Sequence, residues 1–206
     1  MRHSAVAMIA ALLVAGCAET LAGLAAPRVD QDVASLRTGA YSLDDDHAAL
    51  VFRVRHMGLS DFVGRFDRLE ARLDFDAAAP TAAALDVIVD VASLNLPNAG
   101  FAQTLKGGGW LDVARFPTAR FRSTAVRVTG AATGEVDGVL TLHGIDHPQT
   151  LRVKFEGGGR DLIRGGYVVG FSAETGIRRS DYGIDKFEGV VGDTVSIRFD
   201  GEFIRR

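Results

Sequence analysis

The sequence has a single cysteine, Cys17, among its 206 residues. A lone cysteine cannot close an intramolecular disulfide, and it excludes metal sites that are built from several cysteines. No apolar run reaches the roughly 20 residues that a membrane-spanning helix needs. The folded part of the chain must therefore be held together by its own apolar core.

Sequence motifs of common enzyme classes are also missing. The chain has no G-x-S-x-G turn, no P-loop and no dinucleotide-binding glycine motif, and its histidines show no H-x-H or H-E-x-x-H spacing. The formal net charge of −3 does not suit a nucleic-acid binder, which carries a basic surface. We therefore expect no enzymatic activity, no nucleic-acid partner, no metal site and no cofactor.

The start of the chain has the features of an export signal. The uncharged stretch 5–15 follows a basic start, and it ends in Val14-Ala15-Gly16-Cys17, which resembles the bacterial lipobox. We expect residues 1–16 to be a lipoprotein signal peptide and Cys17 to be lipidated, so that the protein is exported and anchored to a membrane. Ala18 after the cysteine favours the periplasmic face of the outer membrane. The alternative is an ordinary signal peptide that is cleaved a few residues later.

The remaining sequence divides into a short tether and one domain. Residues 17–39 are small and polar without a sustained period, and we interpret them as a lipid-anchored tether. Residues 40–206 have a normal length for one domain with a sizeable core.

Alternation with period two dominates from residue 40 onward, and it predicts strands. Eight stretches alternate in this way: 50–55, 68–76, 85–91, 120–129, 136–142, 151–156, 169–177 and 195–203. The alternation slips within residues 123–125, which predicts a β-bulge. Asn98 is a suitable N-cap for one short helix through Lys106, and the glycines at 107–109 would end it between the third and fourth strands.

Short strands that are joined mostly by turns favour an antiparallel sheet. One helix cannot cover the apolar face of eight strands, so we expect the sheet to close into a barrel with its apolar side inward. Such a barrel is either filled by side chains or holds one small ligand. The structural alternative is a two-sheet sandwich.

Several segments of the chain resemble one known family. They are Tyr41–Asp44 with His47, Val51–Gly58, Gly64–Phe66, Leu73–Asp76, Ser93–Asn95, Trp110–Val113, Phe116–Phe121, Gly138–Gly144 and Ile177–Gly183. In this order and spacing they are similar to the YceI-like polyisoprenoid-binding proteins. The resemblance implies an extended lipocalin-like barrel of eight antiparallel strands with one helix, and an exported protein that binds a long isoprenoid chain inside the barrel. The chain departs from the family pattern at Ala48, where Ser or Thr is frequent, and at Gln103, where an acidic residue is frequent.

The inward-facing positions are the candidate ligand-binding residues. The expected apolar wall consists of Leu50, Phe52, Val54, Phe66, Leu140, Phe171, Ala173, Ile177 and Phe199. We expect a polar mouth made by His56, Arg179, Ser180 and Asp181, because His56 ends one inward-facing strand and Arg179 follows another. Two alternatives remain open for the mouth: His56 is a core histidine, and the Arg179 segment forms an Arg–Asp network that fixes a loop.

These observations favour a lipid-anchored carrier that holds one isoprenoid or similar amphipathic lipid. Two other functions remain open at this stage. One is a barrel that binds a haem-like or metal ligand through His56, and the other is a scaffold barrel whose loops bind another protein of the cell envelope.

Overall fold

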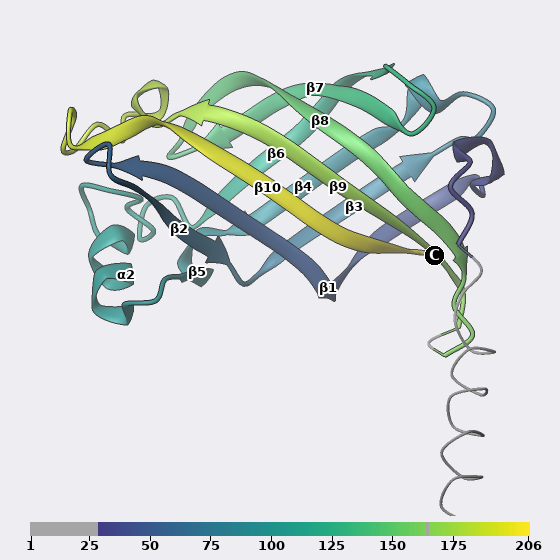
Figure 1. Ribbon diagram of the computed structural model, residues 1–206, viewed down its shortest axis with the longest axis horizontal. Helices are drawn as coiled ribbons and strands as arrows, with labels where there is room; N and C mark the ends of the chain where they lie inside the picture. Colours follow the sequence, from purple (N-terminus) through teal and green to yellow (C-terminus); the bar gives the residue numbers. More distant parts are fainter. Residues whose placement is uncertain (1–28, 164) are drawn as a thin grey trace, which may run out of the picture.

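The computed structural model describes residues 29–163 and 165–206 and forms one antiparallel barrel (Figure 1). The expected signal peptide and the lipidation site at Cys17 lie outside the described residues. Ten strands are present in the described part: β1 Gly39–His56, β2 Ser60–Phe66, β3 Leu69–Phe75, β4 Ala84–Asp90, β5 Leu94–Asn95, β6 Thr118–Val128, β7 Thr133–Leu142, β8 Ile145–Arg160, β9 Tyr167–Arg178 and β10 Val191–Arg205.

Eight of these strands close into a ring. Neighbours around the ring follow the order β1, β3, β4, β6, β7, β8, β9 and β10, and β10 pairs with β1 to close it. These eight are the strands that the alternating pattern predicts, so the prediction of an eight-stranded antiparallel barrel is confirmed. The closing pair β10–β1 rules out the two-sheet sandwich.

Strand β1 is the longest and takes part in two pairings on one side. Its first residues, Gly39–Ser42, pair with β3, whereas Leu50–His56 pair with β2. The two-residue strand β5 then adds to β2. The strands β2 and β5 therefore continue the wall beside the second half of β1, where β3 no longer pairs with it, and Phe66 and Leu94 line the cavity inside the barrel.

The single described α-helix is α2, Ala99–Lys106, and Asn98 caps it as expected: the side-chain oxygen of Asn98 accepts the N–H of Phe101 at 3.0 Å. The helix lies between β5 and β6. This is the expected stretch of chain between the third and fourth predicted strands, 85–91 and 120–129, but the strand numbers differ because the sequence pattern did not predict β2 and β5. The expected bulge is confirmed, since the pairing of β6 with β7 shifts between Ser123 and Ala125.

Short 3₁₀ helices complete the fold: η1 Val33–Ser35, η2 Pro80–Ala82, η3 Val91–Ser93 and η4 Arg179–Tyr182. η1 and α2 lie at opposite ends of the barrel (Figure 1). None of the helices in the described part of the chain has the length and hydrophobicity to span a membrane.

The last residues of the expected tether pack against the barrel. Asp30 forms a β-bridge with Gly158 on β8, and Leu36 is 5% exposed within an apolar cluster that includes Tyr41, Phe155 and Phe203. An apolar side chain such as Leu36 gains about 2 kcal/mol when it leaves water. The packed structure therefore begins before Ala40, because residues 30–38 cover the η1 end of the barrel.

Candidate ligand-binding cavity

The barrel encloses a cavity of about 670 Å³. Its wall includes Val33 and Leu36 from the η1 end and Leu105 and Trp110 from the α2 end, so the cavity extends along the barrel. This volume is within the usual range of roughly 300–1,000 Å³ for small-molecule sites. The barrel is therefore hollow, and its interior is large enough for a ligand.

The period-two alternation along each strand determines which side chains form the cavity wall. Inward-facing side chains from the ring strands are mostly aliphatic or aromatic, with polar exceptions such as Gln149 and Thr175. The opposite face of the same strands carries charged residues in ion pairs such as Lys154 with Glu156 at 2.6 Å. All nine expected apolar wall residues line the cavity, namely Leu50, Phe52, Val54, Phe66, Leu140, Phe171, Ala173, Ile177 and Phe199.

Several phenylalanine rings of the wall lie close over a glycine, and Phe52 and Phe199 are two of them. Gly64 faces Phe52 across the β1–β2 pair, and a Cβ built on Gly64 would lie 2.5 Å from the Phe52 ring. A Cβ on Gly201 would likewise lie 2.5 Å from the ring of Phe199. Because glycine has no side chain, each ring can lie over the neighbouring backbone. This arrangement keeps two large side chains out of the middle of the barrel.

Arg179 is the one charged residue that is buried in the described part of the chain, with 5% of its surface exposed, and it lines the cavity. Its guanidinium donates to four backbone carbonyls: Nε to Gly192 at 3.0 Å, Nη1 to Ile184 at 2.6 Å and to Lys186 at 2.9 Å, and Nη2 to Val191 at 3.0 Å. These bonds hold the segment 184–192 against η4. The cation is therefore fixed in the wall at the α2 end.

The expected polar mouth does not form as predicted. His56 is the last residue of β1; it is exposed and does not line the cavity. His56 therefore does not line the cavity together with Arg179, although its pairing partner Val191 accepts a hydrogen bond from Arg179. The alternative that His56 is a core histidine is wrong.

Ser180 and Asp181 do not line the cavity either. The hydroxyl and the backbone N–H of Ser180 donate to Asp193 at 2.9 and 3.0 Å, and Arg178 donates to the same carboxylate at 2.9 Å. The Ser180 N–H, followed by Arg178 and the Ser180 hydroxyl, lowers the pKa of Asp193 from 3.8 to about 2. The alternative of a network that fixes a loop therefore holds for this segment, with Asp193 as the acidic member.

Tyr182 is a polar residue of this region that the sequence analysis missed. It is 1% exposed and packs with Ile177 and Ile184 in a cluster that also includes Trp110 and Leu140. Its hydroxyl has no hydrogen-bond partner within the described structure, and burial raises its pKa to about 12. An unpaired buried hydroxyl costs about 1–3 kcal/mol of stability. Tyr182 does not itself line the cavity, but Ile177 and Ile184, against which it packs, do.

Comparison with known proteins identifies the family. The model of the YceI-like domain matches residues 41–203. The chain belongs to the YceI-like family. Two curated UPF0312 proteins are similar to it: one from Ectopseudomonas mendocina is 34% identical, over 81% of this chain and 87% of the relative, and one from Azotobacter vinelandii is 32% identical, over 91% and 98%.

Solved structures share the YceI-like fold. BcnA of Burkholderia cenocepacia aligns with a TM-score of 0.69 and 24% identity, over 78% of this chain and 98% of that chain. A polyisoprenoid binding domain from Saccharophagus degradans aligns with a TM-score of 0.57 and 17% identity, over 81% and 98%. At these identities the two structures support the fold, and the resemblance in the sequence motifs is confirmed at the level of the family.

Proposed function

We propose that this protein is a carrier that holds one long isoprenoid-type lipid inside its barrel. The main support for this proposal is the hollow interior with its almost continuous apolar wall. A branched hydrocarbon needs no directional partner, and each buried CH₂ group contributes about 0.8 kcal/mol. The name of the Saccharophagus relative, a polyisoprenoid binding domain, agrees with this class of ligand.

The volume of the cavity sets the length of tail that it holds. A cavity of about 150 Å³ holds one benzene molecule, so 670 Å³ has room for on the order of 25 carbon atoms, or about five isoprene units. A longer lipid would extend beyond the barrel. The ligand that we propose therefore has a tail of this order inside the protein.

The buried guanidinium of Arg179 gives the cavity a polar end. Its carbonyl partners satisfy its hydrogen bonds but do not neutralise its charge, and a buried charge is stabilised by a counter-ion. The unpaired Tyr182 hydroxyl lies in the same region of the fold. We therefore place the head group of the lipid at the α2 end, with its tail toward η1.

The alternative of a haem or metal ligand held by His56 gains no support. Among the described residues, no histidine lines the cavity, and His56 is exposed at the end of β1. Nothing in the fold favours the scaffold alternative over a lipid-binding function, because a scaffold does not need a hollow interior.

Native mass spectrometry tests the proposal. The protein is purified from its own membranes in a mild detergent and then transferred to the gas phase. We expect one bound lipid per chain, and its extracted mass should fit an isoprenoid series. Protein without a bound lipid that also fails to take up polyprenol or polyprenyl phosphate would refute the carrier function.

The position of this carrier in the cell is a second part of the proposal. We propose that Cys17 is lipidated and anchors the exported protein to the outer membrane, on its periplasmic face. Dual or triple acylation gives stable attachment, whereas one chain gives only marginal binding. Cys17→Ser should therefore release a folded barrel into the soluble fraction, and a variant that still sediments with membranes would contradict the single anchor.

A further inference from the structure

The outer face of the barrel carries a bulge where β1 meets β10. Asp44 pairs with Glu202, but the next paired residue on β1 is Ala48, which faces Gly201. The three residues between, 45–47, have no counterpart on β10. A bulge of this kind redirects side chains, and here it turns the chain so that His47 comes back over the Asp44–Glu202 pair.

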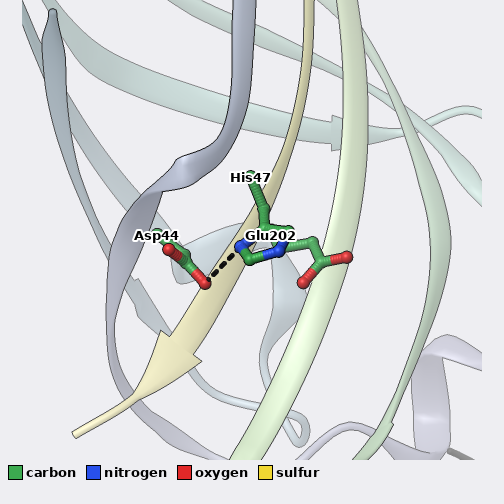
Figure 2. A group of neighbouring side chains, drawn as sticks. All are labelled: Asp44, His47 and Glu202. Atoms are coloured by element: carbon green, nitrogen blue, oxygen red, sulfur yellow. Dashed lines mark hydrogen bonds and ion pairs between the residues drawn. The ribbon is translucent and has the colours of Figure 1, made fainter. Parts of the chain in front are cut away.

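The bulge gathers three metal-ligating side chains on one spot. Asp44, His47 and Glu202 each offer one ligand atom, and these atoms all lie within 4.8 Å of one another. The Nδ1 atom of His47 lies 2.9 Å from a carboxylate oxygen of Asp44. Figure 2 shows the imidazole ring of His47 with Asp44 on one side and Glu202 on the other.

We propose that this cluster binds one divalent transition-metal ion, and we assign it to zinc. One imidazole nitrogen and two carboxylate oxygens are a common zinc set with three protein ligands, at about 2.0–2.2 Å from the metal. Calcium and magnesium prefer sites made of oxygen alone. The ligand atoms need only small side-chain movements to reach these distances, and the ion takes the place of the hydrogen bond between Asp44 and His47.

Neighbouring residues suit a cation at this position. Asp45 and Asp46 follow Asp44 in the bulge, and their carboxylate oxygens also lie within 4.8 Å of that of Asp44. Glu202 faces Gly170 on β9, so no side chain of that strand position occupies the space beside it. The three ligands have other interactions in the protein, and the metal competes with these.

The ion would connect the two strands that close the barrel. Asp44 and His47 belong to β1 and Glu202 to β10, the first and last strands of the ring. The site lies on the outer face, because the neighbouring Leu43 packs into the core around Phe203. The metal would therefore stabilise the closure of the barrel without contacting the lipid.

The experiment uses the full chain, without an affinity tag, purified in detergent and stripped of metal with a chelator. Zinc and, separately, calcium are titrated by isothermal calorimetry. His47→Gln and Glu202→Gln remove one ligand each, and His147→Gln is the control, because this histidine lies elsewhere on β8 and contacts the carbonyl of Asp181. Far-UV circular dichroism checks each fold, and Asp44→Asn replaces any variant that does not fold.

We expect one zinc ion per chain, at least tenfold weaker binding in both cluster variants, and unchanged binding in His147→Gln. Calcium should bind at least tenfold more weakly than zinc. Zinc should also raise the melting temperature of the wild type and the control, but not that of His47→Gln. Absence of zinc binding, or equal binding by the wild type and the two cluster variants, would overturn the proposal.

Discussion

Replacement of Ala173 by tryptophan distinguishes a hollow barrel from a packed one. Ala173 lies on β9 between Phe199 of β10 and Val153 of β8, and all three residues line the cavity. A tryptophan side chain at this position would project into the middle of the lumen. It would fill space that the lipid tail otherwise occupies.

The size of the cavity determines how far the substitution should change the free energy of unfolding and the affinity for lipid. In the protein without lipid, the new ring has room, so the free energy of unfolding should change by less than about 1 kcal/mol, whereas overpacking of a filled core costs about 1–3 kcal/mol or more. The nine ring atoms of indole displace about nine carbons of the tail, which are worth up to about 7 kcal/mol at 0.8 kcal/mol each. If the tail recovers half of this by taking another path, binding weakens by several hundredfold.

The assay combines urea unfolding of the lipid-free protein with titration of a fluorescent polyprenyl lipid. Ser196→Trp is the matched control, because Ser196 is exposed on β10 next to the same strands. The control should bind lipid as the wild type does. Strong destabilisation of Ala173→Trp would show that the interior is packed, and undiminished lipid binding by a folded variant would show that the tail lies elsewhere.

Three further predictions concern the α2 end. Tyr182→Phe should raise the free energy of unfolding of the lipid-free protein by about 1 kcal/mol in urea, because it removes an unpaired buried hydroxyl; a loss of stability would show that the hydroxyl has a partner. Arg179→Ala should cost about 3 kcal/mol or more in the same assay, since it leaves four carbonyls without their donor, and an effect below 1 kcal/mol would contradict this role. The pKa of Asp193 is lowered from 3.8 to about 2, so its contribution is present above pH 4 and is lost as the pH falls toward 2. Asp193→Asn should therefore flatten the stability profile over this range by about 1 kcal/mol, allowing for screening by solvent; an unchanged profile would exclude Asp193 as the cause.

The alternating pattern predicted the ring because burial on one face of a strand leaves a strong signal in the sequence. It missed β2, where Gly64 stands at an inward position that would otherwise carry an apolar residue, and β5, whose two residues are too short to show a period. It also missed the packing of Leu36, because an isolated apolar residue in a polar segment has no periodic context.

The polar part of the site was harder to predict for a physical reason. Parity along a strand predicts the face on which a side chain lies but not whether that position is covered, and His56, the last residue of β1, is exposed. The burial of Arg179 depends on four carbonyls from the segment 184–192, which includes the start of β10, and no local pattern specifies those contacts. The Asp44–His47–Glu202 cluster likewise needs a pairing between the first and last strands, which are distant in the sequence.

Because the rings of Phe52 and Phe199 lie over glycines, the width of the lumen can change without a change in the residues that line it. Gly64 and Gly201 do not line the cavity, yet a methyl group on either would meet the ring of Phe52 or Phe199. The ring would then have to turn into the lumen and shorten the space for a lipid tail. Single methyl groups behind the wall are therefore enough to change the chain length that the barrel accepts, without altering any residue that touches the lipid.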